Sequence, residues 1–302
     1  MSKKKRSELT NRIEYFWFKL FLNCIRIIPY GWGCWVGKRI GWLAYAILPS
    51  RRRLTVENIA AAQEHGYLSG RASRQLARQV WENMGLLGSE FLYYYSRGFE
   101  ALKERVVLEG AANIEKVLAK KKGAILVMAH LGNWELLGLY LSSVGYQLSP
   151  LVKNQSNPLV NAIIQERRQS AGMKVISRTG FLRPVILALR KNEMVPFLID
   201  QATRRGVAIE MFGRTANFPP GAAEFALKTD TPVLLTYMVR EADGTFRLVV
   251  SEEIELTKTG DYEQDLQINA TRFIKLLEEV IEAYPDQWLW MHKLWPQTKI
   301  KI

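Results

Sequence analysis

The chain has few of the residues that staple small domains or hold metal ions. Only two cysteines occur among its 302 residues. Both, Cys24 and Cys34, fall in an apolar segment, which excludes a disulfide framework and favours a reducing compartment. The three histidines lack the carboxylate or thiol spacing of a metal site. We therefore expect no metal ion and no other cofactor.

Signatures of nucleic-acid binding are also absent. The sequence contains no zinc-finger spacing, no P-loop and no ribonucleoprotein aromatic motif. Its 42 Lys and Arg against 29 Asp and Glu give a net charge of +13, and nine of its residues are Trp. Positive charge combined with many aromatic side chains favours an anionic membrane surface, and not nucleic acid, as the partner.

The apolar N-terminal stretch 13–48 has no uncharged window of about 18 residues, the length that a membrane-spanning helix needs. It also lacks a signal-peptide cleavage site. Arg12, Lys19, Asn23 and Arg26 fall on one narrow stripe of a helix whose other residues are mostly apolar. This pattern is typical of a helix that lies in the membrane interface. The alternative is a hairpin that packs on the protein's own core.

Beyond this stretch, helical patterns alternate with short apolar runs. Apolar residues spaced three and four apart predict helices over 57–64, 71–95, 111–120, 157–170, 181–191, 221–229 and 264–283. Short apolar runs predict strands over 123–128, 146–152, 174–176, 194–199, 233–239 and 245–250. The alternation predicts an α/β fold with a central, mainly parallel sheet flanked by helices.

The segment around His130 is the most informative part of the sequence. The strand predicted over 123–128 delivers His130 to a turn, and Asn133 then caps an amphipathic helix. His130 is therefore expected at the carboxyl end of a strand, where open α/β sheets carry their sites. Glu135 falls in the first turn of that helix, close enough to hold the imidazole.

This pair suits general-base catalysis. A neutral imidazole takes a proton from an attacking hydroxyl, and a carboxylate on its other nitrogen fixes the tautomer. N–H groups near the turn 131–133 are expected to stabilise the developing oxyanion. No Ser or Cys nucleophile is adjacent, so direct attack by a substrate hydroxyl fits better than an acyl-enzyme. The alternative is a structural His130 and a solvated Glu135 favoured by the helix dipole.

His130 to Glu135 resembles the H-x4-E motif of the bacterial lipid A biosynthesis (lauroyl/myristoyl) acyltransferases, within the wider lysophospholipid acyltransferase group. Further segments resemble elements of that family in the same order: Arg51–Asn58, Ile199–Gln201, Met211–Gly213, Asn217–Gly221 with Thr231–Val233, and Pro285–His292. The resemblance implies a glycerolipid acyltransferase-like fold. Residues 51–302 would then form the acyltransferase domain and residues 1–50 a basic, aromatic-rich membrane anchor.

The resemblance further implies transfer of a fatty acyl chain from a thioester, typically on acyl carrier protein, to a hydroxyl of a lipid A precursor or related anionic glycolipid. The expected location is the cytoplasmic face of the bacterial inner membrane. His130 would be the general base and Glu135 its orienting partner. Asn133, in the turn between them, is expected to line the substrate site.

Candidate contacts to acceptor phosphates come from two other places. Asp200, Arg204 and Arg205 are expected to line the substrate site, at a position similar to the phosphate-binding block of glycerolipid acyltransferases. That block usually reads Glu-Gly-Thr-Arg, whereas this chain has Asp-Gln-Ala-Thr-Arg. The alternative for Asp200 is a structural acid at the strand end that caps a neighbouring loop. Lys153 stands where many relatives have Arg; it keeps the charge but loses the bidentate fork. His292 lies among tryptophans, which favours packing over catalysis there.

Three other functions remain open on the sequence. In the first, the acceptor is another glycolipid, such as a phosphatidylinositol mannoside, and acyl-CoA is the donor. In the second, the chain is a non-catalytic membrane scaffold, although an intact pair of His130 and Glu135 argues against this. In the third, it is a thioesterase-like hydrolase, in which water replaces the lipid hydroxyl.

Overall fold

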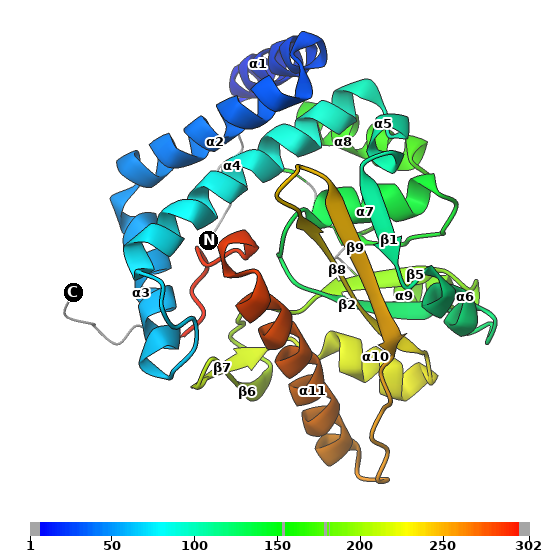
Figure 1. Ribbon diagram of the computed structural model, residues 1–302. Coiled ribbons are helices and arrows are strands. Elements are labelled where there is room, and N and C mark those ends of the chain that lie inside the picture. Colours follow the sequence, from blue (N-terminus) through cyan, green and yellow to red (C-terminus); the bar gives the residue numbers. More distant parts are fainter. Residues whose placement is uncertain (1–6, 153–154, 178–179, 181, 296–302) are drawn as a thin grey trace.

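The computed structural model describes residues 7–152, 155–177, 180 and 182–295 (Figure 1). The helices are α1 (Glu8–Ile27), α2 (Tyr30–Ile47), α3 (Pro49–Glu64), α4 (Ser73–Arg97), α5 (Glu100–Lys103), α6 (Ala111–Leu118), α7 (Trp134–Ser143), α8 (Pro158–Ser170), α9 (Leu182–Arg190), α10 (Gly221–Thr229), α11 (Tyr262–Ala283) and the short 3-10 helix η1 (Pro285–Gln287). The strands are β1 (Val106–Glu109), β2 (Ala124–Met128), β3 (Leu151–Val152), β4 (Ile176–Ser177), β5 (Met194–Leu198), β6 (Val207–Met211), β7 (Arg214–Phe218), β8 (Val233–Arg240) and β9 (Phe246–Glu253).

The central sheet has five strands in the order β1-β9-β8-β2-β5. Strand β2 runs parallel to both of its neighbours, β5 and β8, and β1 runs parallel to β9. Only the β8–β9 pair is antiparallel in this sheet. The predicted α/β fold with a mainly parallel sheet is therefore confirmed. Because β2 and β5 are parallel neighbours, the residues that follow them meet at one edge of the sheet.

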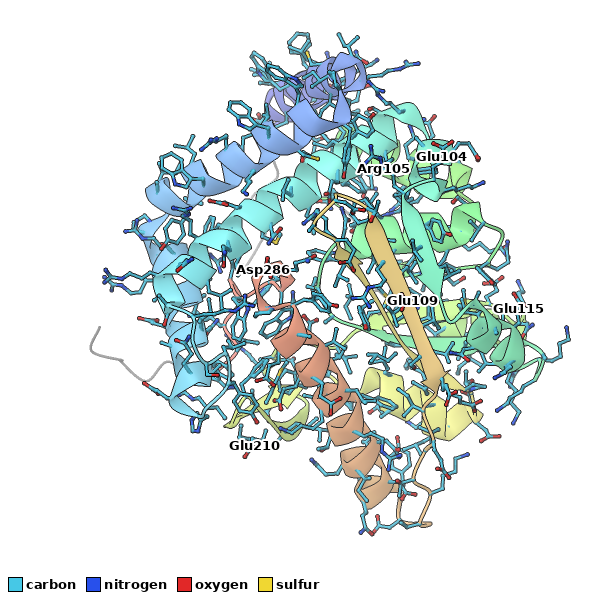
Figure 2. All side chains as sticks on the ribbon, in the orientation of Figure 1. Glu104, Arg105, Glu109, Glu115, Glu210 and Asp286 are labelled. Carbon is cyan, nitrogen blue, oxygen red and sulfur yellow. The ribbon has the colours of Figure 1, made fainter. Side chains whose placement is uncertain are left out.

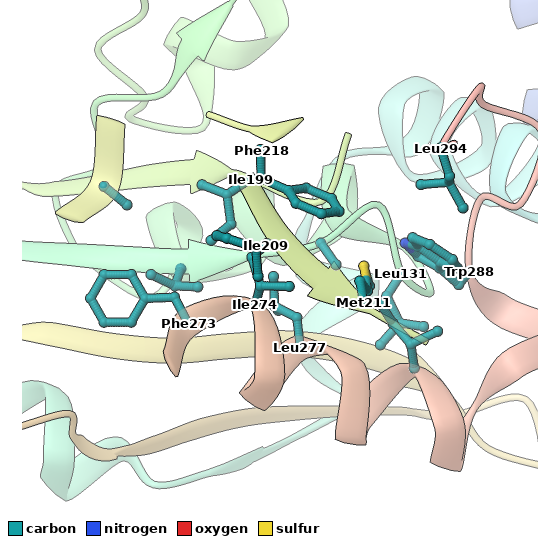
Figure 3. Packing of buried hydrophobic residues seen from close by; sticks show 14 of the residues in the cluster. Leu131, Ile199, Ile209, Met211, Phe218, Phe273, Ile274, Leu277, Trp288 and Leu294 are labelled. Atoms are coloured by element: carbon teal, nitrogen blue, oxygen red, sulfur yellow. The ribbon is translucent and has the colours of Figure 1, made fainter. Parts of the chain in front are cut away.

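The sheet separates two hydrophobic cores, and β2 shows why. All five of its residues are buried, and successive side chains point to opposite faces. Ile125 and Val127 join the core beneath α9, α10 and α11, whereas Leu126 and Met128 join the core beneath α6 and α7. Figure 3 shows part of the first core, in which side chains of α11 face those of β6.

The structure differs from the predicted elements in several places. Helix α3 begins at Pro49 and not at residue 57, and α5 was not predicted. The strand predicted over 146–152 is ordered as a strand only in β3, which pairs with β4 apart from the central sheet. Pro150 lies just before β3, and its missing N–H cannot continue a ladder. Strands β1, β6 and β7 were not predicted. Each has only four or five residues, and most of these lie outside the core, so none is apolar over its whole length in the sequence.

The two N-terminal helices, α1 and α2, both pack on α4: α2 lies along it, and α1 contacts α4 and α8 (Figure 1). They are called the N-terminal helix pair below. Glycines allow the close approach: a Cβ on Gly41 would lie 2.1 Å from the Trp81 carbonyl oxygen, and one on Gly85 would lie 2.0 Å from that of Gly37. On its outer side the N-terminal helix pair projects side chains away from the rest of the molecule (Figure 2). In the described part of the chain, no helix combines the length and apolar character needed to span a membrane.

Candidate active site

His130 lies in the turn between the carboxyl end of β2 and the start of α7, as the sequence predicts. The Asn133 side chain caps α7 by accepting from the Leu136 N–H at 3.1 Å. Gly132 has a φ of 57°, and a Cβ there would lie 1.8 Å from the Met238 carbonyl oxygen. Only glycine fits this turn, because both the backbone conformation and the space exclude a side chain.

Asp200 holds the imidazole of His130. It follows β5, and its Oδ1 lies 2.8 Å from His130 Nδ1. Its Oδ2 accepts from the His130 backbone N–H at 2.9 Å and from the Trp288 indole N–H at 2.8 Å. The Asp200 side chain is 2% exposed and that of His130 is 18% exposed, so the pair is buried on one side and accessible on the other.

The electrostatics of this pair fix its tautomer. Burial opposes a charge on His130, but the carboxylate of Asp200 outweighs burial and raises the pKa of the imidazole above 6.5. Burial likewise opposes a charge on Asp200, yet His130 and the bond from Trp288 lower its pKa. Asp200 is therefore a carboxylate, His130 Nδ1 carries a proton donated to it, and Nε2 is the free base.

The partner predicted from the sequence, Glu135, lies elsewhere. Its carboxylate pairs with Arg168 of α8 at 3.0 and 3.4 Å. The carboxylate that bonds to the His130 ring belongs to Asp200. The expectation that Glu135 holds the imidazole is thus corrected, because the first turn of α7 directs Glu135 towards α8. Its negative charge still contributes to the raised pKa of His130.

Two residues outside the predicted site complete the cluster. Gln201 follows Asp200, and its Nε2 lies 3.3 Å from both ring nitrogens of His130 and 2.7 Å from Nε2 of His292. The packing expected for the neighbouring tryptophans is found, since Trp288 and Trp290 are buried. His292, however, lies within 6.2 Å of the His130 ring, centre to centre. Only its place in the closing Pro285–His292 segment signalled it in advance.

A cavity of about 580 Å³ opens beside His130 and Gln201. Its lining also includes the charged side chains of Glu135 and Arg168. Buried apolar residues line it as well, namely Met128, Leu137, Gly138, Leu148 and Met173. A cavity that combines a few polar groups with buried apolar lining suits an amphiphilic ligand.

A second cavity of about 470 Å³ adjoins the first through Ala202 and Thr203. Arg204 and Lys293 line it, whereas Arg205 is exposed and does not line either cavity. Lys153 falls outside the described residues. In the described part of the chain, no three His, Cys, Asp or Glu side chains are grouped to hold a metal ion.

The N–H groups expected to stabilise an oxyanion are mostly engaged. Gly132 N–H donates to the Gln287 carbonyl at 2.9 Å, and Asn133 N–H donates to that of Met238 at 3.2 Å. The prediction is therefore wrong for these two groups. The Asn133 side chain is also buried, facing Glu90 at 2.9 Å, so Asn133 supports the turn and does not line the cavity. It was predicted as a substrate-site residue from its neighbours alone.

Comparison with known proteins identifies the family. The sequence model of the bacterial lipid A biosynthesis acyltransferases matches residues 1–297. The chain belongs to this family. It is 24% identical to the lipid A biosynthesis palmitoleoyltransferase of Escherichia coli over 300 residues, covering 96% of this chain and 94% of that protein. It is also 28% identical to the phosphatidylinositol mannoside acyltransferase of Mycobacterium tuberculosis over 196 residues, covering 63% and 59%.

As a member of the lipid A biosynthesis acyltransferase family, the chain is an acyltransferase. A solved structure, the 1-acyl-sn-glycerophosphate acyltransferase PlsC from Thermotoga maritima, is 20% identical and covers 78% of this chain and 97% of that chain. Its TM-score of 0.36 is too low for its geometry to support an argument about this site.

The pH dependence of this acyltransferase is expected to follow His130. Only its neutral form can accept a proton, and its pKa is raised above 6.5 by Asp200. With His130 as the base that the sequence predicts, kcat/KM is expected to rise with pH and level off only above that value. The Asp200→Asn variant loses the carboxylate, and the remaining activity is expected to level off at lower pH. A pH profile of kcat/KM for both proteins measures this. A wild-type profile in which kcat/KM already levels off at or below pH 6.5 contradicts this expectation.

Proposed function

We propose that the chain transfers a fatty acyl chain from a thioester donor to a hydroxyl of an anionic glycolipid, with His130 as general base. The observation that carries this proposal is the bond from His130 Nδ1 to the buried Asp200 carboxylate at 2.8 Å, beside a cavity lined by both polar and apolar residues. Asp200 is a positioning residue, since it acts through the imidazole.

The proposed step is a direct acyl transfer. The acceptor hydroxyl gives its proton to Nε2 of His130 as its oxygen bonds to the thioester carbon, and the carbonyl electron pair moves to the oxygen. The electron pair then re-forms the carbonyl, the C–S bond breaks, and the thiolate takes the proton from His130. The products are an ester and a thiol. The acyl chain is assigned to the part of the cavity that buried apolar residues line. Leu137, Gly138 and Met173 are among these residues and would exclude water there.

The acceptor phosphate is assigned to the second cavity, where Arg204 and Lys293 are the cationic side chains. We expect Arg204→Gln to raise KM for a phosphorylated acceptor about tenfold, because a hydrogen bond to a charged group contributes about 1.5–3 kcal/mol. Arg205→Gln is the matched control and should change KM little. Steady-state kinetics with phosphorylated and dephosphorylated acceptors measure both effects. A larger effect of Arg205→Gln contradicts the assignment.

The N-terminal helix pair, α1 and α2, is proposed to dock on the cytoplasmic face of the bacterial inner membrane. Thirteen of the twenty exposed large hydrophobic side chains of the described residues lie between Leu9 and Leu48. They include Trp17, Trp32 and Trp35, which are 62%, 67% and 55% exposed. Arg12, Lys19 and Arg26 are exposed on α1 and are suited to anionic headgroups.

Replacing Trp17, Trp32 or Trp35 by Ser is expected to weaken vesicle binding about tenfold each, because burying one such side chain contributes about 1.5–3 kcal/mol. Cosedimentation with vesicles that contain anionic phospholipid measures the binding. Val107→Ser is the control, since Val107 is 59% exposed but lies on β1, outside the N-terminal helix pair. Equal binding by the tryptophan variants and the wild type contradicts membrane docking through this surface.

The donor and acceptor classes are tested together. Purified full-length protein in vesicles is given acyl carrier protein thioesters or acyl-CoA, with lipid A precursors or phosphatidylinositol mannosides as acceptors. We expect an ester on a lipid A precursor from the carrier-protein thioester. The relative named for phosphatidylinositol mannoside supports the second acceptor, and transfer only to that lipid would replace the first. Free fatty acid without any ester would instead indicate a hydrolase.

A further inference from the structure

The oxyanion of the tetrahedral intermediate needs hydrogen-bond donors, but several backbone N–H groups in the turn around His130 already donate to other acceptors. The N–H of His130 is donated to Asp200 at 2.9 Å. Those of Gly132 and Asn133 are donated to backbone carbonyls at 2.9 and 3.2 Å. None of these three groups is free for the oxyanion, so a side-chain donor in the cavity wall is a candidate.

Gln201 is placed to be that donor. It lines the cavity, and its amide nitrogen is 3.3 Å from both ring nitrogens of His130, of which only Nε2 can accept a hydrogen bond. Because His130 Nδ1 carries the proton donated to Asp200, Nε2 is an acceptor and the amide nitrogen donates to it. A primary amide has two hydrogens. One points to His130, at the place where the acceptor hydroxyl and the thioester must meet, and the other points to His292 Nε2 at 2.7 Å.

His292 fixes the orientation of this amide. Its Nε2 accepts from Gln201 only in the neutral form that has the proton on Nδ1. Burial, aided by the nearby His130, lowers the pKa of His292, which keeps it neutral at physiological pH. Its backbone is held in turn by Asn58, whose amide donates to the carbonyls of Trp290 at 2.8 Å and His292 at 2.6 Å. The donor is thus oriented before the substrate binds.

We propose that Gln201 donates the side-chain hydrogen bond to the oxyanion, and that His292 is a positioning residue for its amide. The inference rests on the proposed acyl transfer. In the resting site, one amide hydrogen of Gln201 points to His130 Nε2. Nε2 has one lone pair, so it no longer accepts from Gln201 once the acceptor hydroxyl donates to it. The amide hydrogen is then free for the thioester carbonyl oxygen, which gains the electron pair as Nε2 takes the hydroxyl proton. Collapse of the intermediate returns the proton to the thiolate, and the original bond re-forms.

Conservative variants of Gln201 test the donor. Gln201→Met keeps the length of the side chain and removes the amide, so kcat is expected to fall about 10²–10³-fold with KM changed by no more than about twofold. Gln267→Met is the control, because Gln267 is exposed on α11 and lies outside both cavities. For His292, the Gln variant offers an acceptor oxygen and should retain most activity, whereas the Phe variant should lose it.

A binding measurement separates transition-state stabilisation from a structural role. A long-chain alkyl phosphonate monoester mimics the tetrahedral oxyanion, and a thioether analogue of the donor mimics the ground state. Calorimetry should show that Gln201→Met weakens the phosphonate about 100-fold, in line with the loss in kcat, and leaves the thioether unchanged. Equal loss of both ligands would overturn the inference.

The outcomes also separate this inference from the proposed function. Wild-type protein that transfers no acyl chain and binds no phosphonate contradicts both. Normal transfer by wild type together with a Gln201→Met kcat within about threefold of it contradicts the inference alone. The donors would then be the N–H groups of Trp134 and Glu135, which in the described part of the chain have no acceptor.

Discussion

Asp200→Asn is expected to lower kcat by about four orders of magnitude, the loss found when a buried catalytic aspartate is amidated beside its histidine. Asparagine keeps the shape but turns an amide N–H or a weaker acceptor towards His130, so the imidazole loses the tautomer that leaves Nε2 free. Steady-state acyl transfer measures kcat, and circular dichroism checks the fold. Substrate affinity should change little, since Asp200 is buried and lies behind the imidazole.

Glu135→Gln is the informative comparison. Glu135 pairs with Arg168 at 3.0 Å and does not hold the imidazole, so its variant should lose much less activity than Asp200→Asn. If Glu135→Gln lost as much kcat as Asp200→Asn with its fold intact, the pair predicted from the sequence would be the functional one. The assignment of Asp200 as the partner of His130 would then be wrong.

Glu90→Gln is expected to lower the free energy of unfolding by about 3–5 kcal/mol, because it leaves Arg240 buried without a counter-charge. The Glu90 side chain is 0% exposed and that of Arg240 is 11% exposed. Nε and Nη2 of Arg240 both donate to the Glu90 carboxylate, which also accepts from Asn133 in the turn after His130 at 2.9 Å. The pair therefore joins α4, β8 and the catalytic turn in one network.

The double variant Glu90→Leu with Arg240→Met separates charge from packing. Removing both partners together should recover much of the lost stability, since apolar residues of similar size often replace a buried ion pair at little cost. Urea unfolding followed by circular dichroism gives the free energies. Glu8→Gln serves as control because Glu8 and Arg12 form a pair that is 81% and 71% exposed. A loss for Glu90→Gln no larger than for Glu8→Gln contradicts this account.

Local features of the site were predictable from the sequence. Strand β2, His130 and helix α7 follow from a short apolar run, a turn with glycine and a capping Asn133, all of which act over a few residues. The partner of His130 was not predictable in this way. Asp200 is 70 positions away, and only the pairing of β2 with β5 brings the two strand ends together.

The residues that surround the site depend even more on tertiary structure. Asn58 lies 232 positions before the carbonyl of Trp290 to which it donates, and no local pattern links them. The family resemblance included both segments, Arg51–Asn58 and Pro285–His292, in the order of the family's elements. It did not predict that they contact each other, nor what either does. His292 was expected in a packing cluster because its tryptophan neighbours dominate the local pattern. Its contact with Gln201 arises where the closing segment crosses the strand ends.

The most direct test of the central claim is ester formation by His130→Gln in a single turnover. Wild type and variant are mixed in excess with a labelled acyl carrier protein thioester and a glycolipid acceptor, and the acylated lipid is quantified by mass spectrometry. We predict that wild type forms the ester and that His130→Gln, with its fold verified, forms none above the uncatalysed rate. Ester formation by His130→Gln at the wild-type rate would contradict the role of His130 as the base.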